Sequence, residues 1–163
     1  MTEKLWAPWR LEYVAEAGSH DGCVFCAEAA GELGDGSLVV ARGSHAFVLL
    51  NKFPYASGHL MVAPFRHLAE LAELEPDEVA ELHALTTAGI DALRRVYRPD
   101  AFNVGWNLGA VAGGSIAGHL HEHLVPRWSG DTNFMPVLAD VKVLPEHLRA
   151  TRERLRERWN DTV

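Results

Sequence analysis

Histidine occupies every second position over the first five residues of the stretch HLHEHLVPRW, which spans residues 119–128. The row consists of His119, His121 and His123. Side chains in an extended strand alternate between two faces, so this spacing predicts that the three imidazoles share one face and that Glu122 points to the other. A row of imidazoles on one face either holds a metal ion or handles protons at an anionic reaction centre. These residues alone leave both alternatives open.

Length and charge narrow the class of protein. A chain of 163 residues favours one domain, and 48% apolar with 23% charged residues is the ordinary balance of a soluble globular protein. The net charge of −7 argues against broad nucleic-acid binding, which normally requires a basic surface. No apolar stretch is long enough to span a bilayer, and the first residues lack the apolar core of a signal peptide. We therefore expect a cytoplasmic protein that binds neither nucleic acid nor a membrane.

The pattern of apolar residues predicts several strands and two helices. Short β-branched and apolar runs predict strands at 37–42, 45–51, 59–64, 101–107 and from 119 onward. A helical stripe of apolar residues runs from Pro76 to Tyr97, and an arginine-rich helix is predicted at 145–160. Residues 1–30 read as an N-terminal arm that contains CVFC. The expected fold is one α+β domain over 1–163, with a mostly antiparallel sheet of about five strands.

A loop rich in small residues, GAVAGGSIAG at 109–118, leads directly into the histidine row. Its four glycines allow backbone N–H groups to approach a ligand closely, and such concavities bind phosphate. On composition alone, a flexible hairpin connection is an equal alternative. Because the loop ends at His119, we expect its amides and the imidazoles to share one cavity.

Phosphate-binding amides beside imidazoles favour phosphoryl or nucleotidyl transfer. A neutral imidazole is a competent nucleophile toward phosphorus, and the resulting phosphorus–nitrogen bond is readily cleaved. His121 is the best candidate because it has an imidazole on each side. Its neighbours can donate hydrogen bonds to phosphate oxygens and protonate the leaving group.

The stretch HLHEHLV resembles the motif of the histidine-triad (HIT) superfamily, in which three histidines alternate with apolar residues. Residues 49–67 and 102–119 resemble the segments that flank this motif in the family, so the resemblance covers nearly the whole chain. The start LWAPWR and the PRW after the triad are most similar to bacterial dinucleoside-polyphosphate phosphorylases and hydrolases near the fragile-histidine-triad branch. Glu122 departs from the motif. Burying it unpaired would be expensive, so we expect an open face, an arginine or a partner chain there.

The resemblance implies cleavage of a dinucleoside polyphosphate, such as diadenosine tetraphosphate, through a covalent nucleotidyl-His121 released by phosphate or water. It implies that the catalytic residues are His121, His123, His119 and His59. It places nucleotide contacts at Asn51, Leu49, Met61, Asn107, Gly113, Gly114 and Ser115. It also implies a homodimer that binds an adenine dinucleotide or mononucleotide.

The pair of cysteines in CVFC has several interpretations. The spacing suits a metal clip, a redox pair or two isolated buried thiols, although a thioredoxin-like site would need a βαβ setting that is missing here. The resemblance implies the metal, since some bacterial histidine-triad proteins complete such a pair with two histidines. The zinc ligands would then be Cys23, Cys26, His67 and His119. Four such ligands form a closed structural site, with one zinc per chain.

Three other functions fit the same residues. The chain can be a hydrolase of adenosine phosphoramidates or aminoacyl adenylates, because no motif defines the pocket for the leaving group. It can be a regulatory module that binds nucleotides with incidental turnover. In a third alternative, His119, His121 and His123 together hold a catalytic metal.

Overall fold

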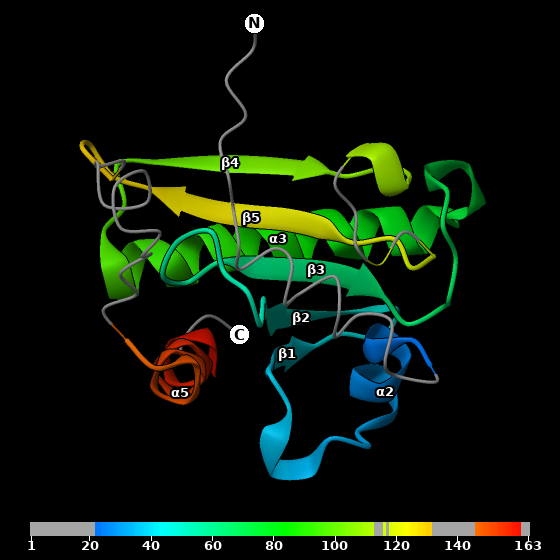
Figure 1. The fold of residues 1–163 in the computed structure, drawn as a ribbon, viewed down its shortest axis with the longest axis horizontal. Helices are drawn as coiled ribbons and strands as arrows, with labels where there is room; N and C mark the ends of the chain where they lie inside the picture. The colour runs from blue at the N-terminus through cyan, green and yellow to red at the C-terminus, as the bar shows by residue number, and fades with distance from the viewer. Residues whose placement is uncertain (1–21, 113–115, 117, 132–145, 161–163) are drawn as a thin grey trace, which may run out of the picture.

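The computed structural model describes residues 22–112, 116, 118–131 and 146–160 of the chain (Figure 1). A five-stranded sheet lies at its centre in the order β1-β2-β3-β5-β4, and every neighbouring pair is antiparallel. The strands are β1 (Val39–Arg42), β2 (Ala46–Leu50), β3 (Leu60–Pro64), β4 (Ala101–Trp106) and β5 (Glu122–Arg127). The predicted α+β class with an antiparallel sheet is confirmed.

Two long helices pack against one face of this sheet (Figure 1). They are α3 (Pro76–Tyr97) and α5 (Leu148–Asn160). The bounds of α3 match the prediction because its signals are local. Pro76 opens the helix, Glu75 and Glu78 form a capping box, and Arg98 ends it in the left-handed conformation with φ 48°. Among the described residues, no helix is both long and apolar enough to cross a membrane.

The opposite face of the sheet is covered by α2 (Val24–Ala30), a helix that the sequence did not predict. It lies within the stretch read as an N-terminal arm, and its Phe25 is fully buried. The apolar cluster on this face, called the α2 cluster below, consists of Phe25, Val39, Phe47, Leu49, Met61 and Ala63. Since both faces of β2 and β3 are covered, every residue of these two strands is buried. Three short 3-10 turns complete the described part: η1 (Gly34–Gly36), η2 (Leu71–Glu73) and η3 (Ala110–Ala112).

Strand β5 begins at Glu122, three residues later than the predicted start at His119. The residues before it leave the sheet because their hydrogen bonds go to the loop after β3. The backbone N–H of Leu120 donates to the carbonyl of Leu68 at 2.6 Å. Contacts with that loop, together with the pleat, therefore place His119, and the rings of His119 and His121 both contact Phe25.

Glu122 does point away from the imidazoles, and a side chain of α3, not an arginine, meets it. Its carboxylate accepts a hydrogen bond from the hydroxyl of Thr86, a buried residue of α3. A charged acceptor makes such a bond roughly twice as strong as a neutral one. The glutamate is therefore satisfied beneath the long helix without an arginine.

Candidate active site and metal cluster

His121, the nucleophile predicted from the sequence, lies just before β5 with 7% of its surface exposed. Its Nδ1 lies 2.8 Å from the carbonyl oxygen of His119. A carbonyl only accepts hydrogen bonds, so Nδ1 donates its hydrogen and Nε2 keeps a lone pair. Burial lowers the pKa of His121, outweighing the opposite effect of this bond. The geometry thus presents an unprotonated ring nitrogen, the form that attacks an electrophile.

A chain of hydrogen bonds orients His123, whose ring centroid lies 4.9 Å from that of His121. The chain starts at the backbone N–H of Tyr55, which donates to Nδ1 of the fully buried His59 at 3.0 Å. His59 therefore carries its hydrogen on Nε2, which lies 3.0 Å from Nδ1 of His123. A neutral His123 then carries its own hydrogen on Nε2, 3.2 Å from the side-chain nitrogen of Asn107. Because both of these nitrogens are donors, a hydrogen bond between the two side chains requires the Asn107 amide to present its oxygen at this position. His123 is thus set to donate a hydrogen bond from Nε2.

The burial of His123 leads to a prediction about pH. Burial, with a smaller contribution from the charge of His121, lowers the pKa of His123 to about 4. We expect the imidazole to stay neutral in the folded protein down to about pH 5. Folding stability should fall as the pH drops from about 6.5 toward 4, because only the unfolded chain binds the proton in that window.

Nitrogen-15 NMR of the imidazole, recorded across this range, measures the charge of His123 directly. A His123 signal that titrates near pH 6.5, as a free imidazole does, would contradict the prediction.

Four predicted metal ligands come together at the N-terminal end of α2. The ligand atoms of Cys23, Cys26, His67 and His119 all lie within 4.8 Å of one another. The sulfur of Cys23 is 3.3 Å from Nδ1 of His119, and that of Cys26 is 3.3 Å from Nδ1 of His67. Zinc bonds of 2.0–2.3 Å at tetrahedral angles require ligands about 3.5 Å apart. Of the histidine row, only His119 joins this cluster, so in the described part of the chain the triad itself does not form a metal site.

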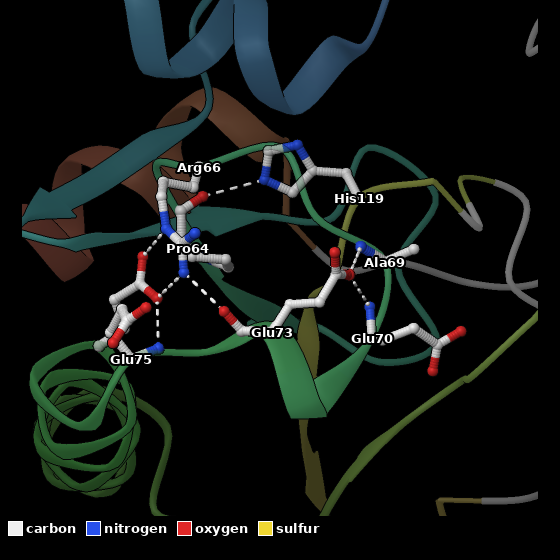
Figure 2. A network of polar contacts seen from close by, with 8 residues as sticks. Pro64, Arg66, Ala69, Glu70, Glu73, Glu75 and His119 are labelled. Atoms are coloured by element: carbon white, nitrogen blue, oxygen red, sulfur yellow. Dashed lines mark hydrogen bonds and ion pairs between the residues drawn. The ribbon is translucent and has the colours of Figure 1, made fainter.

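The hydrogen bond on the far side of His119 fits metal binding. Its Nε2 lies 2.9 Å from the carbonyl of Pro64, and Figure 2 shows the ring turned toward that oxygen. The hydrogen must therefore be on Nε2, which leaves the lone pair of Nδ1 facing the cysteines. A ligating histidine usually donates its other N–H in this way. The residues therefore fit a zinc ion as a Cys₂His₂ set.

An ion pair holds the loop that carries His67. The Arg66 guanidinium donates to both carboxylate oxygens of Glu78, at 2.7 and 2.6 Å. It also donates to the carbonyl of Glu73 at 2.7 Å (Figure 2). The bond to Arg66 lowers the pKa of Glu78 to about 2, so the carboxylate stays charged at neutral pH. The exposed His67 therefore directly follows Arg66, whose ion pair with Glu78 fixes it to the first turn of α3.

The residues predicted to bind the nucleotide lie in three places. Asn51 follows β2, and its Nδ2 is 3.4 Å from Nδ1 of His59. Leu49 and Met61 pair across β2 and β3, and Met61 is also the partner of His123 in β5. Both therefore lie on the face that carries the imidazoles, where they are almost fully buried. Asn107 lies beside His123, and the other three residues, Gly113, Gly114 and Ser115, lie outside the described part.

Sequence reasoning missed three groups that take part in these contacts. Two of them, the N–H of Tyr55 and the carbonyl of Pro64, belong to the backbone, so no residue type signals them. The third is the ring of Phe25, whose centroid lies 4.7 Å from that of His121 and 5.1 Å from that of His119. Its position between the two cysteines of CVFC was the available signal.

A protein-family model and a known protein both match this chain over more than half of its length. The HIT domain model matches residues 35–130. The AP-4-A phosphorylase of Mycobacterium tuberculosis (strain H37Rv) is 46% identical over 164 residues, which cover 96% of this chain and 84% of the relative.

Two solved structures share the fold. A hypothetical histidine triad nucleotide-binding protein from Sulfolobus tokodaii has a TM-score of 0.69 at 25% identity, covering 85% of this chain and 93% of that one. A Zn-bound histidine triad family protein from Mycobacterium smegmatis has a TM-score of 0.68 at 24% identity, covering 86% and 95%.

Proposed function

The chain belongs to the HIT domain family, as its histidine row predicted, and from this premise we propose that it cleaves dinucleoside polyphosphates such as diadenosine tetraphosphate. The likeness to AP-4-A phosphorylase confirms that the chain is an enzyme of this family and supports the substrate class. The observation that carries the proposal is the state of His121. Its Nδ1 is bonded to a carbonyl, which leaves Nε2 available to attack phosphorus.

In the proposed first step, the lone pair of His121 Nε2 forms a bond to a phosphorus atom of the substrate. The bond from that phosphorus to the bridging oxygen breaks, and the departing nucleotide takes the electron pair. His123 keeps its Nε2 hydrogen and donates a hydrogen bond to this oxygen, which stabilises the negative charge that builds on the departing nucleotide. The positive charge that builds on the His121 ring is stabilised by the carbonyl of His119.

In the second step, phosphate or water attacks the same phosphorus atom, and the phosphorus–nitrogen bond breaks. The electron pair returns to Nε2 of His121, and the proton released by an attacking water passes to solvent, because His123 keeps its hydrogen in both steps. The bond from His59 to Nδ1 of His123 supports this role, because it holds the ring in one orientation throughout.

We propose that the substrate contacts follow the family pattern. Asn51 would bind the ribose hydroxyls, and Leu49 and Met61 would line the adenine pocket. The phosphates would be held by Asn107, Gly113, Gly114 and Ser115. The position of Asn107 beside Nε2 of His123 supports a contact with the phosphate under attack.

We propose zinc as the metal of the Cys₂His₂ cluster, in a structural role. Bound there, it would supply no chemistry to the substrate, because the four ligands complete its tetrahedral shell. Cys23 and Cys26 would tie α2 to the loops that carry His67 and His119. This would fix the backbone carbonyl to which His121 is bonded.

We further propose a homodimer that pairs through the outer edge of β4. This strand ends the sheet, and its residues are more exposed than those of the inner strands. The exposed apolar residues Val104 (45%) and Leu108 (44%) lie on and just after it. An open edge of this kind is a template for strand pairing with a second chain. Cytoplasmic location and the lack of nucleic-acid or membrane partners remain predictions from the sequence.

Product analysis tests the proposed function. Diadenosine tetraphosphate is incubated with the protein, with and without inorganic phosphate, and the nucleotides are separated by chromatography. Given the likeness to a phosphorylase, we expect ADP plus ATP, formed only when phosphate is present.

Other products would change the assignment. AMP plus ATP without phosphate would make the protein a hydrolase. Cleavage of an adenosine phosphoramidate or an aminoacyl adenylate, with the tetraphosphate left intact, would replace the proposed substrate class. Tight binding of a non-hydrolysable nucleotide with no turnover of any substrate would indicate a regulatory module.

A further inference from the structure

We propose that Phe25, one of the two residues between the cysteines, is a positioning residue for His121 and links the metal cluster to the nucleophile. The inference rests on the proposed function, since it concerns how the attacking ring is held. The observation behind it is that the fully buried ring of Phe25 contacts two histidine rings. One belongs to His119, a proposed metal ligand, and the other to His121.

The hydrogen bonds of His121 leave one movement of its ring undefined. The bond from Nδ1 to the carbonyl of His119 selects the tautomer. A single hydrogen bond, however, still allows the ring to tilt about its axis, and that tilt moves Nε2 away from the line of attack. Phe25 restricts it, with ring centroids 4.7 Å apart and planes inclined at 31°. The ring of His123 meets His121 nearly edge-on at 74°.

Phe25 is held in place from both ends of α2. At the C-terminal end, the carboxylate of Glu28 accepts hydrogen bonds from the hydroxyl of Ser37 at 2.6 Å and from the backbone N–H of Leu38 at 2.9 Å. Arg42 donates to the carbonyl of Ala29 at 2.9 Å. These contacts connect the end of α2 to the segment that leads into β1 and to β1 itself.

At the N-terminal end, the cysteines on either side of Phe25 lie in the metal cluster. Cys23 precedes the helix and Cys26 immediately follows Phe25. When all four ligands bind one ion, the backbone on both sides of Phe25 is fixed relative to His119. The ring is then held against His121 by covalent and coordinate bonds as well as by packing. The metal cluster thereby affects the nucleophile without contacting the substrate.

The test compares two identical substitutions in the α2 cluster, Phe25→Leu and Phe47→Leu. Both phenylalanines are fully buried, but Phe47 stacks on Phe65 and does not share the ring contacts with the two histidines. We expect kcat for diadenosine tetraphosphate to fall about tenfold to a hundredfold in Phe25→Leu, with KM within about twofold. Phe47→Leu should keep kcat within about threefold of wild type, and both variants should retain zinc.

A second readout needs no substrate. In imidazole nitrogen-15 spectra, His121 should give one sharp set of signals in the wild type and in Phe47→Leu. It should give broadened or doubled signals in Phe25→Leu. If Phe25→Leu does not fold, Phe25→Met, which keeps more of the volume and remains unbranched, replaces it in both measurements.

The outcomes separate this inference from the proposed function. Equal losses of kcat in the two leucine variants, or unchanged His121 signals in Phe25→Leu, would overturn the positioning role while leaving the function intact. A wild type that cleaves no dinucleotide, with His121 signals that still respond to Phe25→Leu alone, would overturn the function and keep the positioning role.

Discussion

Replacing His121 with alanine should lower kcat for diadenosine tetraphosphate by about ten-thousandfold or more. Among the described residues, the variant lacks the one group placed to form a bond to phosphorus, and no neighbouring histidine can replace it. His119 has its Nδ1 among the metal ligands, and Nδ1 of His123 is occupied by His59. The measurement is a rate of ADP and ATP formation under saturating substrate and phosphate. Because a phosphorus–nitrogen bond hydrolyses in acid and survives in alkali, rapid quench of the wild type in alkaline denaturant should in addition trap a nucleotidyl group on His121.

His83→Ala serves as the matched control. This histidine is exposed on α3, away from the sheet face that carries the imidazoles, so the rate should stay within about twofold of wild type. If His121→Ala retains more than about one per cent of the wild-type rate, the covalent mechanism is wrong. If the wild type quenched in alkali carries the nucleotide on another residue, the nucleophile has been misassigned.

Replacing Cys26 with serine should remove zinc and destabilise the fold. We expect one zinc per chain in the purified wild type and none in Cys26→Ser. The free energy of unfolding should fall by about 3–5 kcal/mol, because binding energy at a structural metal site is also folding energy. Elemental analysis gives the metal content, and urea titration gives the free energy.

A chelator should reproduce the effect of Cys26→Ser in the wild type, because His67 is exposed and both cysteines are only partly buried. Val24→Ser provides the control within the same helix. Val24 is 39% exposed and contributes no ligand, so this variant should keep its zinc and most of its stability. A wild type that purifies without metal and unfolds identically with and without chelator would remove zinc from the proposal.

Elements with local signals were predicted well. The bounds of α3 follow from Pro76 at its start, acidic residues in its first turn and Pro99 just beyond its end, all of which act within one or two turns. The strands at β2 and β3 also follow from short apolar runs, since both faces of these strands are buried.

Elements that depend on distant contacts were missed or misplaced. The seven-residue α2 is too short to be stable by itself, and it is held by Arg42 and by packing of Phe25. Strand β5 starts late because Leu120 bonds to the carbonyl of Leu68. In each of these contacts the two residues lie too far apart in the sequence to create a periodic pattern of residue types. A prediction based on spacing therefore extended the strand to His119.

The sequence by itself determined the chemical groups of this protein. Three alternating histidines, two cysteines and a glycine-rich loop define which atoms are available, and their motif identifies the family. Only the tertiary structure decided which nitrogen of each imidazole carries the hydrogen. That choice depends on the partner of the ring, and the partners are the backbone groups of Tyr55 and Pro64 for two of the rings. Because Pro64 lies far from His119 in the chain, and His59 far from His123, His119 faces the cysteines and His59 orients His123 only once the sheet has formed.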